Sequence, residues 1–211
     1  MMTYCKSFFY AVLAGICIGI GGAVNLSVDN PVVGAFLFSI GLIMICTNGF
    51  NLFTGKVGYL TDQKPAYLLF LLTVWIGNFA GTALVGYAMR FTRSAVTKDG
   101  ARVYSMVQTK LNDTPLSIFI LAFFCGILMY LAVNGYRVIE HHVGKYIALI
   151  LPVAVFILCG FEHCVANMFY FSAADAWSDP KVWGYLGIMT LGNACGSVFF
   201  HLIEKLAKPK G

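Results

Sequence analysis

Residues 146–170 read YIALILPVAVFILCGFEHCVANMFY, and this stretch decides the fold. It is long and apolar enough to cross a bilayer as a helix, which takes about 20 residues. Inside it, however, Gly160-Phe161-Glu162-His163-Cys164-Val165-Ala166-Asn167 places glycine among polar groups. Backbone groups freed by such a break are tolerated at membrane depth only where protein or a water-filled cavity satisfies them. The stretch therefore predicts a membrane helix that is broken beside an aqueous passage.

A second interruption lies in the first half of the chain, within the apolar span 31–53. There, Thr47-Asn48-Gly49-Phe50-Asn51-Leu52-Phe53-Thr54-Gly55 again combines glycine with polar side chains. Broken helices at corresponding positions of two halves are typical of inverted-repeat transporters, whose permeation site lies near the bilayer midplane. We therefore expect the breaks, in spans two and five, to face each other and make a pore.

Two short motifs indicate an internal repeat. Residues 76–82 read IGNFAGT and residues 191–197 read LGNACGS, three predicted spans apart. An odd number of spans per repeat inverts the second copy in the membrane. Because small residues also serve close helix contacts, two unrelated packing motifs are the alternative. We predict one transmembrane channel domain over residues 1–211, with inverted repeats at about 7–90 and 115–204.

The composition argues against a water-soluble helical bundle, which is the alternative fold. Of the 211 residues, 59% are apolar and 11% are charged, whereas a soluble domain carries roughly a quarter charged residues. No cleavable signal is expected, because the first six residues run directly into an apolar span. The prediction is an all-α membrane protein with six transmembrane helices, at about 8–26, 31–53, 66–89, 116–136, 146–170 and 182–203.

Loop lysines and arginines set the expected orientation. With the N-terminus inside, inner segments hold eight and outer segments six, five of them in the 90–115 loop. We expect a multi-pass protein of the inner (plasma) membrane with both termini in the cytoplasm. The basic loop is interpreted either as an outer vestibule that concentrates anions or as a solvated loop at the lipid headgroups. The net charge of +5 does not indicate a nucleic-acid partner, since no soluble basic domain carries it.

Glu162 and His163 are the most informative pair, because ionisable groups at membrane depth are costly and usually functional or paired. Glu162 is interpreted chiefly as a brace that accepts backbone N–H groups of the broken helix. His163 is interpreted as exchanging a proton with a passing weak acid, since an unperturbed imidazole titrates near pH 6.5; a hydrogen-bonded core residue is the alternative. The Thr54 hydroxyl suits an anion or a histidine, unless it caps its own helix.

Narrow rings of apolar side chains can gate a pore by excluding water. Ordinary packing is the alternative for each of the five candidates: Phe38, Leu42, Leu52, Phe53 and Phe156. The chain has no nucleotide-binding loop, no metal-ligand cluster and no CxxC pair among its seven cysteines. We therefore predict no catalytic residues, no metal, no cofactor and no enzyme activity. A haem anchor that uses His163 or His201 is a disfavoured alternative, because no second histidine is placed opposite His163.

The segment CGFEHCVANMF at Cys159–Phe169 closely resembles the span-five signature of the formate/nitrite transporter family, and Leu52-Phe53-Thr54-Gly55 resembles its span-two loop. The resemblance covers nearly the whole chain. It implies an aquaporin-like homopentamer with one pore per protomer and interrupted spans two and five. The resemblance implies the pore histidine His163, the loop threonine Thr54 and the anion-attracting Lys110. We add Glu162 and Asn167 to the predicted substrate pathway; hydrogen bonds that close the loop are the alternative for the Asn167 amide.

The resemblance also implies positions for the two constrictions. The inner one would hold Leu42 and Phe156 with Phe38 close by, and the outer one Leu52 and Phe53. Three residues depart from the family pattern: Phe50, Asn51, and Gly126 in place of an asparagine that faces the histidine.

The predicted function is a pH-dependent channel or transporter for a small monovalent weak-acid anion, with formate or nitrite as the expected substrate. Lys110 would draw the anion in, the apolar constrictions would strip its water, and His163 would exchange a proton with it. A hydrosulfide or short-carboxylate channel of the same family and a facilitator of a neutral solute are the alternatives.

Overall fold

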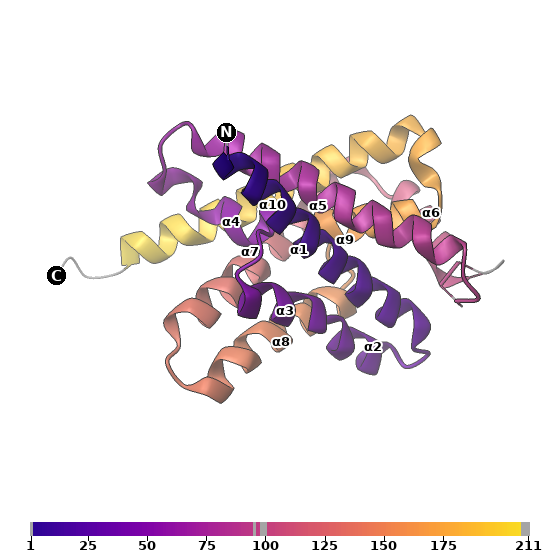
Figure 1. Cartoon of the computed structure of the whole chain (residues 1–211), viewed down its shortest axis with the longest axis horizontal. Helices are drawn as coiled ribbons and strands as arrows, with labels where there is room; N and C mark the ends of the chain where they lie inside the picture. Colours follow the sequence, from indigo (N-terminus) through magenta and orange to yellow (C-terminus); the bar gives the residue numbers. More distant parts are fainter. Residues whose placement is uncertain (1, 95, 98–100, 208–211) are drawn as a thin grey trace.

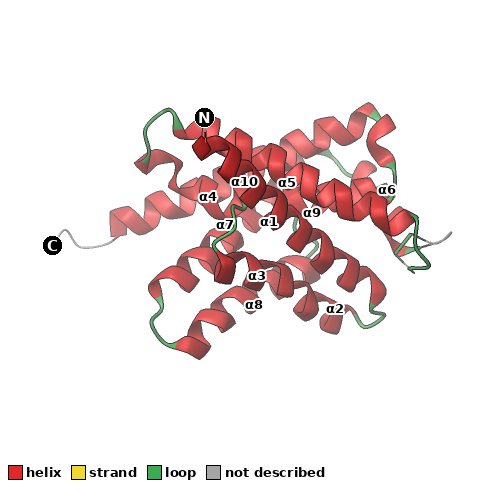
Figure 2. Ribbon diagram, in the orientation of Figure 1, coloured by secondary structure: helices red, strands yellow, loops and turns green. Residues whose placement is uncertain are grey.

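The computed structural model describes residues 2–94, 96–97 and 101–207, and every regular element in these ranges is a helix (Figures 1 and 2). In chain order the elements are α1 (Met2–Ser27), α2 (Pro31–Phe38), α3 (Ile40–Asn48), α4 (Phe53–Lys56), η1 (Val57–Asp62), α5 (Tyr67–Arg90), α6 (Arg102–Leu111), α7 (Pro115–Val138), α8 (His142–Leu158), α9 (Cys164–Ala173), η2 (Ala176–Ser178) and α10 (Pro180–Ala207).

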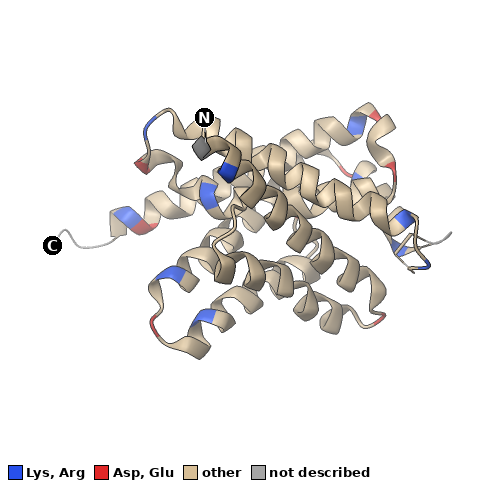
Figure 3. Ribbon diagram, viewed as in Figure 1, with Lys and Arg blue, Asp and Glu red and all other residues tan. Residues whose placement is uncertain are grey.

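Five stretches of the described residues are long and apolar enough to cross a membrane: Tyr4–Ser27, Pro31–Asn48, Tyr67–Arg90, Pro115–Val138 and Pro180–Ala207. The remaining predicted span, 146–170, is divided between the shorter helices α8 and α9. Large apolar side chains such as Leu68, Leu84 and Leu116 are exposed along the helices, while charged residues gather near the helix ends (Figure 3). This distribution suits a bilayer, and the predicted all-α membrane class is confirmed.

The two halves of the chain are built alike. Helix α1 packs along α5 in the first half, and α7 packs along α10 in the second. In each pair a glycine of the repeated motif allows backbones to touch: a Cβ on Gly81 would overlap the Val12 carbonyl, and one on Gly196 would overlap the Phe123 carbonyl. The two motifs therefore make equivalent contacts in the two helix pairs.

The two predicted breaks are present but shorter than the sequence suggested. Helix α3 ends at Asn48, directly before Gly49, and α8 ends at Leu158, two residues before Gly160; both glycines adopt left-handed backbone angles, with φ of 69° and 66°. Such angles favour glycine because a Cβ would clash. Thr47 and Asn48 still belong to α3, and Thr54 already belongs to α4. Cys164–Asn167 likewise form the first turn of α9, because capping groups satisfy its N-terminus and let the helix resume early.

Two further features were not predicted. Span two has a second interruption at Ser39, whose hydroxyl donates to the Phe36 carbonyl at 2.6 Å. The 90–115 loop contains the amphipathic helix α6, which buries Val103, Val107 and Leu111. The first residues of α1 and the last residues of α10 lie on one side of the molecule and α6 lies on the other (Figure 1). We call these the termini side and the α6 side.

Candidate permeation site

Two asparagines hold the ends of the broken helices at the centre of the molecule. Asn78 of α5 accepts the backbone N–H of Phe53 at 2.8 Å, and Asn193 of α10 accepts that of Cys164 at 2.8 Å. Each amide group also donates to two carbonyls at 2.8 Å: Asn78 to Ala11 and Asn51, and Asn193 to Ala122 and Glu162. These are the asparagines of the two repeated motifs. From the sequence we interpreted the motifs as an internal repeat and assigned no role to their asparagines, although the repetition was a signal for this clamp.

His163 and Thr54 meet where the two broken helices come together. The Nε2 atom of His163 lies 2.8 Å from Thr54 Oγ1, and both residues are buried. The other ring nitrogen, Nδ1, accepts the Ala166 N–H at 3.1 Å and so caps α9. An imidazole whose Nδ1 accepts must carry its proton on Nε2. His163 is therefore a neutral ring that donates to Thr54, and the Thr54 hydroxyl hydrogen is left for another acceptor.

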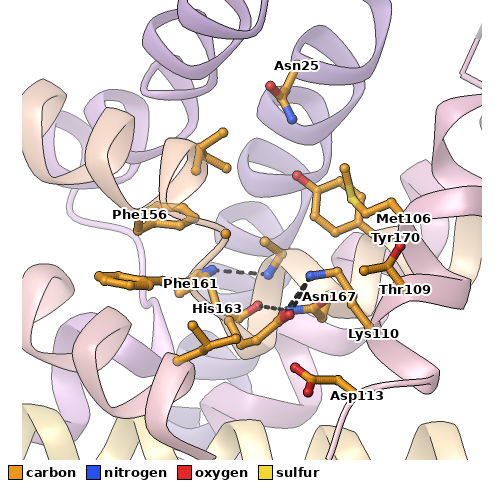
Figure 4. Close-up of a pocket in the computed structure, with 15 residues that line it drawn as sticks. Asn25, Met106, Thr109, Lys110, Asp113, Phe156, Phe161, His163, Asn167 and Tyr170 are labelled. Carbon is orange, nitrogen blue, oxygen red and sulfur yellow. Dashed lines mark hydrogen bonds and ion pairs between the residues drawn. The ribbon is translucent and has the colours of Figure 1, made fainter. Parts of the chain in front are cut away.

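Lys110 does not stand free in a basic vestibule, and this corrects the predicted environment. Its Nζ lies 2.6 Å and 2.8 Å from the two carboxylate oxygens of Glu162 (Figure 4). Asn167 Nδ2 donates to the same carboxylate at 2.8 Å and to the His163 carbonyl at 3.0 Å. Glu162 thus braces the break through a lysine and an amide, and not through the backbone N–H groups that were expected.

Other cations of the 90–115 loop are also engaged in contacts. Arg102 donates to the Asn25 and Val28 carbonyls, and Arg90 pairs with Asp175 at 3.1 Å. Lys98, counted with this loop, lies outside the described residues. Arg90 and Arg102 therefore help to hold the loop and α6 against the helix bundle, and their charges are already engaged in these contacts.

Five apolar side chains surround the centre, and all are buried: Phe38, Leu42, Leu52, Phe53 and Phe156. The rings of Phe38 and Phe156 meet edge to face, with centroids 5.7 Å apart, and the Phe156 ring lies 5.5 Å from that of His163.

Cavities approach this centre from both sides. The α6-side cavity, of about 280 Å³, reaches Phe156 and His163, and Lys110 and Tyr170 also line it (Figure 4). The termini-side cavity, of about 190 Å³, reaches Leu52. Phe156 therefore lies toward the α6 side and Leu52 toward the termini side, which is the reverse of the inner and outer positions predicted for them together with cytoplasmic termini. The reason is that α8 and α3 each extend beyond the centre of the pore before they end. Gly160, after α8, lines the α6-side cavity, and Gly49, after α3, lines the termini-side cavity.

The termini-side cavity contains two cations that were not singled out from the sequence. Lys56, in the last turn of α4, and Arg137, in the last turn of α7, both line it. The sequence offered one signal for a cation near the pore, which is that Lys56 follows Thr54 by two residues. The resemblance placed Gly126 where an asparagine would face the histidine. In the structure, a Cβ at this position would overlap the Asn193 carbonyl, so Gly126 allows α7 to pack closely against α10.

The arrangement defines a membrane channel: a dry centre with one imidazole, closed by apolar side chains and approached by a cavity from each side. A sequence model described as formate/nitrite transporter matches residues 1–205. The chain belongs to the formate/nitrite transporter family. It is accordingly a multi-pass membrane protein that transports anions, and not an enzyme.

Relatives and solved structures agree with this assignment. The chain is 26% identical to the formate channel FocA of Haemophilus influenzae over 226 residues, covering 95% of this chain and 78% of the relative. It is 27% identical to the nitrite transporter NirC of Escherichia coli over 224 residues, covering 95% and 82%. It superposes on a pentameric formate channel with formate bound, with a TM-score of 0.79, 29% identity and 97% coverage of both chains. An ion channel of the family gives a TM-score of 0.84 at 26% identity, covering 98% and 90%.

Proposed function

We propose that this protein is a homopentameric, pH-dependent channel for a small monovalent weak-acid anion, with formate or nitrite as its substrate. The relatives named above carry one or the other of these anions in their names, and at about 27% identity they do not distinguish between them. In this proposal it resides in the inner membrane with both termini in the cytoplasm.

The observation that carries the proposal is the buried His163–Thr54 hydrogen bond between the two broken helices. An anion that passes Phe156 or Leu52 loses water, which disfavours its bare charge. The Thr54 hydroxyl hydrogen is then available to it, because the Thr54 oxygen already accepts from His163. These two residues offer the anion a polar contact at the driest point of the path.

Proton exchange at His163 has a structural condition. A second proton on the ring must go to Nδ1, which accepts the Ala166 N–H in this geometry. The N-terminus of α9 also disfavours a cation there. The site therefore rests neutral, and the imidazolium forms only while the bond from Ala166 is open. Flux depends on pH both through the supply of protonated acid and through this short-lived state.

The test is uptake of labelled formate, nitrite, hydrosulfide, acetate and lactate into proteoliposomes between about pH 5 and 8. We expect formate or nitrite to be transported fastest, with a pH dependence that changes in His163→Phe and with slower uptake in Thr54→Val. A pH profile that His163→Phe leaves unaltered would contradict proton exchange at this ring. Transport of neutral solutes without any anion uptake would instead support the neutral-solute alternative, which the resting neutral ring favours.

A further inference from the structure

The two cavities that approach the constrictions differ in charge. Among the residues that line the α6-side cavity, Lys110 is the one cation, and Glu162 and Asp113 are carboxylates, which gives a formal charge of −1. The termini-side cavity is lined by Lys56 and Arg137 with no carboxylate, which gives +2. The residues that line the α6-side cavity therefore offer an anion no net positive charge, whereas both charged residues that line the termini-side cavity are positive.

The charges on the α6 side already satisfy one another. Lys110 Nζ is held by both oxygens of Glu162, and its side chain is only 12% exposed. Asp113 accepts the Thr114 N–H and the Ser117 hydroxyl, at 2.7 Å each. An incoming anion would have to compete with Glu162 for the ammonium group, which leaves no uncompensated positive charge in this cavity.

The termini-side cations have no such partners. No ion pair to Lys56 or Arg137 is present among the described residues. The Arg137 guanidinium lies over the Tyr59 ring, 5.0 Å from its centroid, a contact that leaves its in-plane N–H donors available. Lys56 and Arg137 are also near enough to repel each other. A small anion between them relieves this repulsion.

The cavity is open and leads to the constriction. Gly49 and Arg137 are exposed at its rim, whereas Leu52 at its deep end is buried. Gly55 also lines it, so the cavity walls flank the turn that contains Thr54. An alternative role for Lys56 and Arg137 is that each interacts favourably with the dipole of the helix whose last turn holds it. That role does not explain why the two cations line the same small cavity.

We propose that Lys56 and Arg137 form an anion-binding vestibule on the termini side, which loads the pore from that face with a small carboxylate or oxyanion. This inference rests on the proposed function. It implies a higher apparent affinity for the anion on the termini side than on the α6 side.

The experiment measures initial uptake of labelled formate into proteoliposomes in two orientations, set by capturing a C-terminal tag before reconstitution. We expect half-saturation at a several-fold lower formate concentration when the termini face the formate. Lys56→Gln/Arg137→Gln should raise that value roughly tenfold and leave the value for the opposite orientation unchanged. Lys64→Gln is the matched control, because it removes a lysine from the same side that does not line the cavity.

Three outcomes separate the possibilities. Uptake of neither formate nor nitrite in either orientation would refute the proposed function itself. Uptake with equal half-saturation in both orientations, or an equal effect of Lys64→Gln, would refute the vestibule. An effect of the double variant that occurs only with phosphatidylglycerol, and not in phosphatidylcholine alone, would mean that the two cations bind lipid headgroups, and would also refute it.

A measurement on the unaltered protein avoids dependence on variants that fold poorly. Raising the salt on the termini side from about 0.05 to 0.5 M shortens the screening length from roughly 14 to 4 Å. Half-saturation should then rise on the termini side more than on the α6 side. An equal rise on both sides would contradict the proposed asymmetry.

Discussion

Replacing Lys110 with methionine tests whether this lysine holds the fold together or attracts the anion. The change keeps a long side chain but leaves the Glu162 carboxylate, only 4% exposed, with Asn167 as its remaining side-chain donor. Breaking a buried pair by removing one partner costs about 3–5 kcal/mol, because a charge is left uncompensated. We therefore expect Lys110→Met to lower the free energy of unfolding by about that amount.

The double variant distinguishes this cause from a loss of packing. Removing both charges of a buried pair is often close to neutral, so Lys110→Met/Glu162→Gln should recover most of the lost stability, while the glutamine carbonyl still accepts from Asn167. The assay is chemical denaturation in a mild detergent, with the exposed Lys64→Met as the control. Wild-type stability in Lys110→Met, or a double variant no more stable than the single one, would refute the reasoning.

Three further variants test other parts of the structure. Asn193→Leu leaves the Cys164 N–H and the Glu162 carbonyl without their side-chain partner and removes a second hydrogen bond from the Ala122 carbonyl, and it should cost at least about 2 kcal/mol in the same assay; a loss below about 1 kcal/mol would contradict the clamp. Gly126→Asn should separate α7 from α10 and lower the yield of folded protein in size-exclusion chromatography, rather than improve flux. Hydrogen bonds from Lys205 and His201 hold the pKa of Asp62 below its usual 3.8. The Asp62 carboxylate therefore stabilises the fold above pH 3.8, and this contribution is lost as the pH falls through its lowered pKa. The difference in Tm between wild type and Asp62→Asn should be constant above about pH 5 and shrink in more acidic buffer.

Much of the membrane architecture was predictable because it depends on local composition. A bilayer requires long apolar helices, so four unbroken spans were located close to α1, α5, α7 and α10. The breaks were predictable because glycine with polar neighbours is rare at that depth. Their lengths were not, because the early start of α9 depends on capping groups from α10 and from His163, and these come together only in the fold.

The sequence alone determined that this is a helical membrane protein of two similar halves, with one histidine in its fifth span. Hydrophobic length, small-residue motifs and the residues around His163 are all local features, and they need no knowledge of which segments meet. Only the tertiary structure decided which charges are available to an anion: Lys110 is neutralised by Glu162, 52 residues away, while Lys56 and Arg137 share one cavity. Charge pairing depends on distances of a few ångströms between segments far apart in the chain, and those distances are set by helix packing.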